Sequence, residues 1–185
     1  MEIKNKLESF DKINELGLNK FPEQLFSYNE KEKVKMFLNE YPAKYYAIRD
    51  KSKIGGVFKL KVEYDKVIEE IEEYTSFSIN VSSANYTKNQ LLTGEIEILS
   101  TNEVDATLST DPTASARSAV QNPTINIKTN IFDDDTLKMI PHFDYIYEYI
   151  IVNDLKDIIV EFALFDEKVG INKENIVIYE LRTHY

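Results

Sequence analysis

Several residue types are missing or rare in this chain of 185 residues: it has no cysteine, two histidines and five glycines. Without cysteine there is no disulfide bond, thiolate metal site, iron–sulfur cluster or cysteine nucleophile. His142 and His184 lie far apart in the sequence, which argues against a metal centre built from several histidines. The glycines lack the spacing of the Walker and dinucleotide-binding loops, so any phosphate-binding glycine loop is a short one.

Long apolar segments are also missing. No run approaches the roughly 18 apolar residues of a membrane span, and the first residues lack the apolar stretch of a signal peptide. We therefore expect a cytoplasmic protein that does not cross a membrane. Aspartate and glutamate number 32 against 22 lysines and arginines, so the formal charge is −10. This negative charge argues against nucleic acid or an anionic membrane surface as a partner.

The residues that are present indicate a folded protein with helices and strands. Apolar residues make up 43% of the chain, with 12 tyrosines and 10 phenylalanines. Apolar spacing of three and four predicts helices over 2–16, 30–40, 65–74 and 136–152, the last broken at Pro141. Alternation and short apolar runs predict strands over 44–50, 57–63, 77–82, 92–99, 103–109, 124–129, 158–165 and 176–182.

This order of elements, helices first and then strands mixed with helices, predicts the α+β class. We expect a single domain with a mixed, largely antiparallel sheet and packed helices. Residues 1–42 would form a helical N-terminal arm, and residues 43–185 the α+β domain.

The most basic part of the chain is a strand that leads into two adjacent glycines. It contains Arg49, Lys51, Lys53, Gly55 and Gly56. Adjacent glycines let backbone N–H groups approach an anion closely, and the cationic side chains balance its charge. The segment therefore predicts a phosphate or carboxylate site. The alternative is a hairpin turn beside a basic edge strand, because Gly-Gly is also a turn signal.

The two C-terminal strands each carry one glutamate in an apolar run, Glu161 and Glu180. If these strands pair, the two carboxylates converge on one face, where they bind a divalent cation or share a proton. Arg182 lies two residues after Glu180 and so shares its face. The alternative is therefore a structural ion pair of Arg182 with Glu161 or with Glu180.

Two further features have plainer interpretations. Glu95 and Glu97 alternate with Ile96 and Ile98, which is typical of a half-exposed strand. His184 is a base near the end of the chain, close in sequence to Glu180.

Taken together, the elements from Lys44 to Thr183 resemble the nucleotide-binding half of an ATP-grasp ligase, such as a D-alanine ligase. The resemblance implies that Lys51, Gly55 and Gly56 hold phosphates of ATP and that Glu161 and Glu180 hold Mg²⁺. It places Thr183 at the last position of the family's acid-x-Asn-Thr-like motif. Arg182 stands where the family has a metal-binding asparagine, which would put a cation beside the metal.

The leading hypothesis is accordingly a small ATP-grasp-like protein that binds a nucleotide or another small phosphorylated ligand with Mg²⁺. The sequence leaves open whether it is an enzyme. The alternative is a non-catalytic cytoplasmic interaction or regulatory module, encoded by a host or a phage. Such a module would bind a partner protein through an acidic surface with aromatic anchors.

Overall fold

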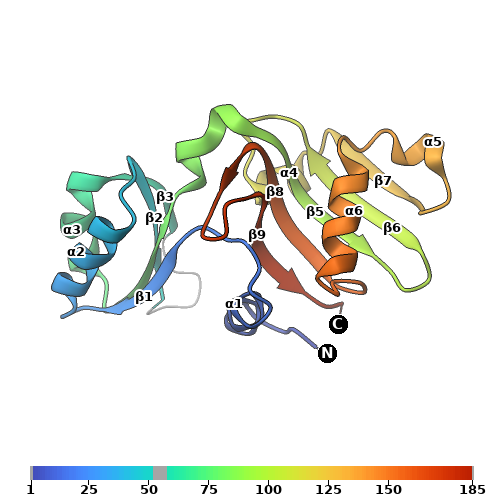
Figure 1. Cartoon of the computed structure of the whole chain (residues 1–185). Helices are drawn as coiled ribbons and strands as arrows, with labels where there is room; N and C mark the ends of the chain where they lie inside the picture. Colours follow the sequence, from blue (N-terminus) through green and yellow to red (C-terminus); the bar gives the residue numbers. More distant parts are fainter. Residues whose placement is uncertain (1, 52–57, 185) are drawn as a thin grey trace. The chain divides into compact units, whose positions relative to one another are not determined.

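The computed structural model describes residues 2–51 and 58–184, and their strands form two sheets (Figure 1). The chain divides into two compact units. The small unit is Phe21–Thr87, and the large unit combines Met1–Lys20 with Lys88–Tyr185. Among the described residues, no helix has the length and apolarity that crossing a membrane requires.

The small unit is a four-stranded antiparallel sheet in the order β1-β4-β2-β3. Its main elements are β1 (Glu23–Ser27), α2 (Lys31–Glu40), β2 (Tyr45–Asp50), β3 (Phe58–Glu63), α3 (Val67–Glu70) and β4 (Ser76–Val81). Short 3₁₀ helices, Tyr64–Lys66 and Ile71–Glu73, flank α3. In its core the ring of Phe26 contacts the rings of Phe37 and Phe77, so α2 is held to the sheet by aromatic packing.

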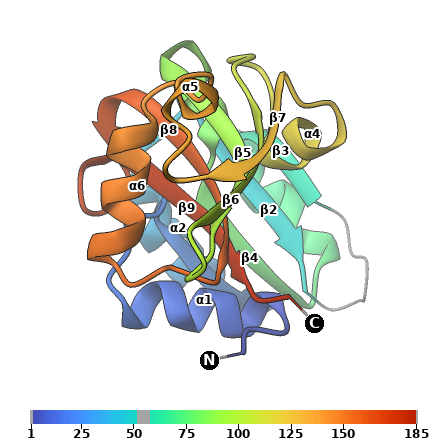
Figure 2. The ribbon, with the colours of Figure 1, turned by 90° about the vertical axis from the view of Figure 1, so that its right-hand side faces the viewer.

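The large unit is a five-stranded antiparallel sheet in the order β7-β6-β5-β8-β9. A 3₁₀ segment, Ser83–Asn89, leads into it. Its elements are α1 (Lys6–Glu15), β5 (Gln90–Ile98), β6 (Glu103–Ser109), α4 (Ala116–Gln121), β7 (Ile125–Asn130), α5 (Asp134–Leu137), α6 (Phe143–Val152), β8 (Ile159–Val169) and β9 (Glu174–Arg182). Figures 1 and 2 show α6 lying along one face of this sheet.

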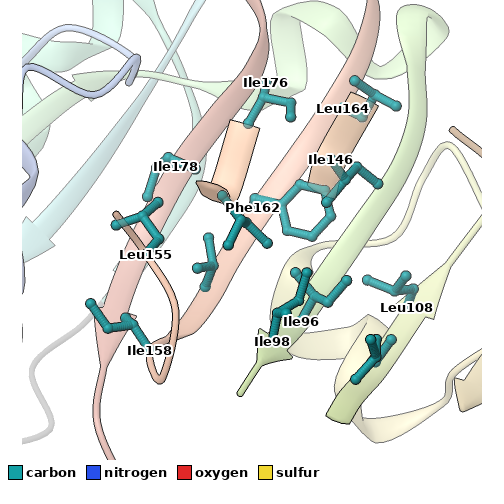
Figure 3. Close-up of a cluster of buried hydrophobic side chains, with 14 of the residues drawn as sticks. Ile96, Ile98, Leu108, Ile146, Leu155, Ile158, Phe162, Leu164, Ile176 and Ile178 are labelled. Carbon is teal, nitrogen blue, oxygen red and sulfur yellow. The ribbon is translucent and has the colours of Figure 1, made fainter. Parts of the chain in front are cut away.

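One face of the large sheet forms the apolar core. Ile96, Phe162 and Ile178 belong to a cluster of buried side chains from β5, β8 and β9. Ile146 from α6 lies beside Phe162 in this cluster (Figure 3). Because successive side chains of a strand point to opposite faces, the residues of β5 and β8 that alternate with this core lie on the other face of the sheet. In β9 a register shift opposite Glu161 and Phe162 interrupts the alternation, so Glu180 lies on that other face although Ile178, two residues earlier, belongs to the core.

The hydrogen bonds of a buried asparagine, Asn19, attach the N-terminal segment to the rest of the large unit. The Asn19 side-chain amide donates to the carbonyl oxygens of Val169, at 2.9 Å, and Ile176, at 2.8 Å. The backbone N–H of Ile178 donates to the carbonyl oxygen of Asn19 at 2.8 Å. Asn19 is fully buried, so these bonds replace water completely and attach the N-terminal segment to the β8–β9 hairpin.

The structure confirms the α+β class and the antiparallel pairing. The strands form two sheets, each antiparallel in every described pairing, rather than one mixed sheet. The predicted arm, residues 1–42, contains one helix of each unit, because α1 belongs to the large unit and α2 to the small one. The predicted break at Pro141 falls between α5 and α6, as expected.

Two elements were not predicted, and one was predicted as longer than it is. Strand β1 buries only Phe26, so it has no alternating pattern. Helix α4 consists mainly of small and polar residues and begins with a capping box at Ser115 and Ser118, a signal that apolar spacing does not register. Residues 65–74 form the short helix α3 between two 3₁₀ turns instead of one continuous helix.

Gly94 provides a stability test of the large sheet. Its φ is +140°, and a Cβ atom there would lie 2.3 Å from the Thr107 carbonyl oxygen and 2.9 Å from the Leu108 Cα. Because both contacts are backbone atoms of β6, we expect Gly94→Ala to lower the free energy of unfolding by about 3 kcal/mol, measured by urea denaturation.

Gly17→Ala is the matched control for this substitution. Gly17 also has a positive φ, +63°, but a Cβ atom there meets no atom within 4 Å. We expect a loss of about 1 kcal/mol from the left-handed backbone alone. Equal losses for the two variants would contradict the close approach of β5 to β6.

Candidate functional site

The non-core face of the large sheet carries three glutamates in a line across three adjacent strands. In the antiparallel register, Glu161 of β8 lies opposite Glu95 of β5 on one side and opposite Glu180 of β9 on the other. Directly opposed residues in such pairs have Cβ atoms about 5 Å apart. We call Glu95, Glu161 and Glu180 the carboxylate row. The strands thus pair as the sequence suggested and bring Glu161 and Glu180 together.

The row has more negative charge than its neighbours balance. Arg182 forms an ion pair with Glu95, and the Lys6 Nζ lies 3.3 Å from the Glu180 Oε2. The carboxylate of Glu161 forms no hydrogen bond or ion pair with any residue in 2–51 or 58–184. Three acids therefore face two cations, and the middle acid is the one without a partner.

The environment of Glu161 disfavours its ionised form. Burial, followed by the neighbouring charges of Glu180 and Glu95, raises the pKa of Glu161 to about 7, against the opposing effect of Lys6 and Arg182. Two unit charges about 5 Å apart repel by about 3 kcal/mol at an effective dielectric constant of 20. Near neutral pH the row therefore exists partly with a proton on Glu161 and favours any added cation.

Two side chains of the C-terminal segment reach over β8 to β5. Arg182 pairs with Glu95, and the His184 Nε2 lies 2.5 Å from the Glu97 Oε2. Strands β5 and β9 are both antiparallel to β8 and therefore run parallel to one another. Moving two residues along each strand, which keeps to the same face, leads from the Arg182–Glu95 contact to the His184–Glu97 contact. Glu97 is only 5% exposed, and its second oxygen, Oε1, has no hydrogen-bond partner among the described residues.

These contacts differ from the ion pairs that the sequence suggested. Arg182 was expected to pair with Glu161 or Glu180, and it pairs with Glu95 instead. His184 was considered as a base beside Glu180, and it contacts Glu97. In both cases the partner lies two strands away in the sheet, a neighbour that spacing along the chain does not reveal. The alternation of Glu95 and Glu97 with isoleucine predicts a half-exposed strand, whereas Glu97 is buried and both glutamates contact the C-terminal segment.

The remaining residue from the resemblance, Thr183, contacts the N-terminal segment. The backbone N–H of Ile3 donates to the Thr183 Oγ1 at 2.9 Å, and that hydroxyl in turn donates to the Ile3 carbonyl oxygen at 3.3 Å. Its hydroxyl therefore holds the first residues of the chain beside the end of β9.

The predicted phosphate-binding segment belongs to the small unit. Arg49 is the fifth residue of β2, and its guanidinium lies 4.6 Å from the ring centroid of Phe58. The backbone N–H of Lys51 donates to the Ser76 carbonyl oxygen at 2.7 Å. Lys53, Gly55 and Gly56 lie outside the described residues. Strands β2 and β3 form the antiparallel pair that the hairpin alternative requires.

Comparison with solved structures gives the class of fold. The chain is similar in fold to an ATP-grasp enzyme, so the resemblance inferred from the order of elements is confirmed as a likeness of fold alone. No protein-family model matches the chain, and no curated protein matches it.

Three of these structures illustrate the likeness. The macrocyclase MdnC of Microcystis aeruginosa MRC, solved with its precursor peptide MdnA, has a TM-score of 0.52 and 14% identity over 96% of this chain and 51% of its own. N5-carboxyaminoimidazole synthase of Aspergillus clavatus has a TM-score of 0.48 and 12% identity over 98% of this chain and 44% of its own. The D-alanine-D-alanine ligase of Coxiella burnetii has a TM-score of 0.45 and 10% identity over 96% of this chain and 47% of its own. The chain thus spans about half the length of these structures.

The charge imbalance of the row predicts an unusual dependence of stability on pH. Because the pKa of Glu161 is raised from 4.5 to about 7 by folding, the folded protein binds more protons than the unfolded chain between these values. This contribution to stability is present below about pH 4.5 and is lost as the pH rises through 7. We expect Glu161→Gln, which removes the charge and keeps the shape, to stabilise the protein by about 3 kcal/mol at about pH 8.

Urea denaturation of both proteins at several pH values measures this difference. The gain from Glu161→Gln should shrink toward zero near pH 4.5. Glu167→Gln, at an exposed position of the same strand, is the control and should show no such trend. A gain for Glu161→Gln that is the same at every pH would contradict the assignment of an uncompensated carboxylate.

Proposed function

We propose that the chain binds a nucleoside triphosphate together with Mg²⁺, in the manner of ATP-grasp proteins. Glu161 and Glu180 would hold the metal ion. The observation that carries this proposal is the carboxylate row, in which Glu161 lies between two other acids without a cationic partner. A divalent cation adjacent to Glu161 would compensate the charge that Lys6 and Arg182 leave unbalanced.

The available ligands fit a metal ion that arrives with a nucleotide. Among residues 2–51 and 58–184, no group of three or more histidine, aspartate or glutamate side chains is arranged to hold a metal ion by itself. Mg²⁺ is typically held by one or two carboxylates, with phosphate oxygens and waters completing its octahedron. The Glu161–Glu180 pair supplies that number, and the bound ion would neutralise charge on the phosphate groups.

The basic segment of the small unit is our proposed phosphate-binding candidate, on the ground of its sequence chemistry alone. Arg49 and Lys51 would contribute cationic side chains, and Lys53 would add a third. Gly55 and Gly56 would allow their backbone N–H groups to approach the phosphate oxygens. The chemistry of the segment supports this assignment, since a guanidinium and ammonium groups recognise phosphate through charge-assisted hydrogen bonds.

We further propose that the protein is cytoplasmic and that its second ligand is a small phosphorylated molecule. The likeness to a solved synthase in complex with ADP and a ribonucleotide is compatible with this ligand class. Any activity stays part of the proposal, because the chain spans only about half of the enzymes it is similar to.

One observation favours the alternative, a non-catalytic interaction module. At the position where the ATP-grasp family has a metal-binding asparagine, this chain has Arg182, and its guanidinium is bound to Glu95. A cation so close to the row weakens its attraction for a metal ion. A protein with this feature would retain the fold while binding its partner without catalysis.

Ligand-induced stabilisation distinguishes the two functions. With ATP and Mg²⁺ at a hundredfold excess over the dissociation constant, we expect the free energy of unfolding to rise by about 2.7 kcal/mol. The rise should be lost in Glu180→Gln and in Glu161→Gln and kept in Glu167→Gln. It should also diminish below pH 7, because a proton on Glu161 competes with the metal ion.

Each component is added separately in the same measurement. ATP without Mg²⁺, and Mg²⁺ without ATP, should stabilise the protein less than the two together. No rise at millimolar ATP and Mg²⁺ would overturn the nucleotide proposal and favour the interaction module.

A further inference from the structure

The large unit contains a surface cavity that the carboxylate row does not use. It has a volume of about 570 Å³ and is lined by residues of α5, of α6 and of the segments next to them. Helix α6 packs on the apolar face of the sheet through Ile146, whereas the carboxylate row is on the opposite face (Figures 2 and 3). The cavity is therefore separate from the proposed nucleotide site, and we call it the α5–α6 cavity.

The lining of the α5–α6 cavity combines apolar and aromatic side chains with charged ones. Leu137 and Ile140 are buried, and the rings of Phe143 and Tyr147 stack with their centroids 5.9 Å apart. Phe143 and Tyr147 are one helical turn apart on α6, so their rings present a continuous surface. Such a lining favours a bulky aliphatic or aromatic side chain.

Two exposed apolar residues lie next in sequence to residues that line the cavity. Phe132 is 77% exposed and Met139 is 63% exposed. Exposed aromatic and methionine side chains are enriched where proteins bind partners. A ligand that extends beyond the cavity would find further apolar surface there.

The charged side chains that line the α5–α6 cavity include more acids than unpaired cations. Asp134 and Asp144 line it, and neither carboxylate forms an ion pair or hydrogen bond within residues 2–51 and 58–184. Lys138 also lines it, but its charge is offset by Asp135, whose Oδ1 lies 3.4 Å from the lysine Nζ. His142 is the remaining titratable group in the lining. The cavity thus combines an aromatic surface with two carboxylates that lack counter-charges.

We propose that the α5–α6 cavity binds a peptide segment of a partner protein that presents arginine or lysine next to a bulky apolar residue. The apolar residue inserts against Phe143 and Tyr147, and the cationic residue is attracted by Asp134 and Asp144. A second copy of the chain fits less well, because its formal charge is −10. A nucleotide fits less well for the same reason, since its phosphates would face two carboxylates.

Fluorescence anisotropy with three labelled octapeptides tests the two parts of this proposal. The probe alternates leucine and arginine, one comparison peptide alternates leucine and glutamate, and the other alternates serine and arginine. We expect saturable binding of the first, and binding at least about tenfold weaker for each of the others. Equal binding of the serine–arginine peptide would overturn the proposal, because it would show attraction by net charge alone.

Two charge-matched double variants show where the peptide binds. D134N/D144N removes the two unpaired carboxylates, and D166N/E167Q removes two exposed charges elsewhere in the large unit. We expect the first to weaken binding of the leucine–arginine peptide by about tenfold and the second by less than about twofold. Equal weakening would place the peptide outside the α5–α6 cavity and overturn the proposal.

A second measurement guards against loss of structure in the first variant. Amide chemical shifts of the unmodified protein, titrated with the leucine–arginine peptide, should change within residues 131–147, and changes confined to other residues would overturn the proposal. Stabilisation by ATP and Mg²⁺ should be unchanged in D134N/D144N. The two proposals therefore fail independently, because each uses its own ligand and its own variants.

Discussion

Strand β8 pairs with β5 on one side and with β9 on the other, and the register of both pairs sets Glu161 opposite Glu95 and Glu180. The same register places Phe162 in the apolar core on the other face. A slip of one residue would turn Glu161 into the apolar core and Phe162 out of it, so the core holds the carboxylates in line. The buried Asn19 attaches the N-terminal segment to the β8–β9 hairpin and thereby supports this register.

Holding three acids in line has an electrostatic cost, and the surrounding cations offset only part of it. Arg182 of β9 pairs with Glu95, and Lys6 of α1 pairs with Glu180, so the two cations balance the outer acids of the row. The repulsion that these cations do not balance, together with burial, raises the pKa of Glu161. A group kept in an unfavourable protonation state by its surroundings is a common property of ligand sites. Glu161 is thus the acid of the row without a cationic partner among the described residues.

The large unit presents different chemistry on its two sides. One face of the sheet carries the carboxylate row, and α6 covers the other face with apolar side chains. The α5–α6 cavity lies at the beginning of that helix, where Pro141 separates it from α5 and His142 adopts a left-handed backbone conformation. The break that ends one helix and starts the next thus leaves aromatic side chains accessible beside unpaired acids. Both faces of the sheet thus carry carboxylates without counter-charges in the described part of the chain, Glu161 of the row on one face and the cavity acids on the side of α6.

The sequence by itself determined the α+β class, most strands and the helix break at Pro141, because alternation and helical spacing are local properties. It also singled out Glu161 and Glu180, since an acid within an apolar strand is conspicuous. Only the tertiary structure decided that Glu95 completes the row and that Arg182 and His184 bind acids on β5. Those partners are more than 80 residues apart in the chain, and sheet order and register, which bring them together, depend on packing that spacing does not encode.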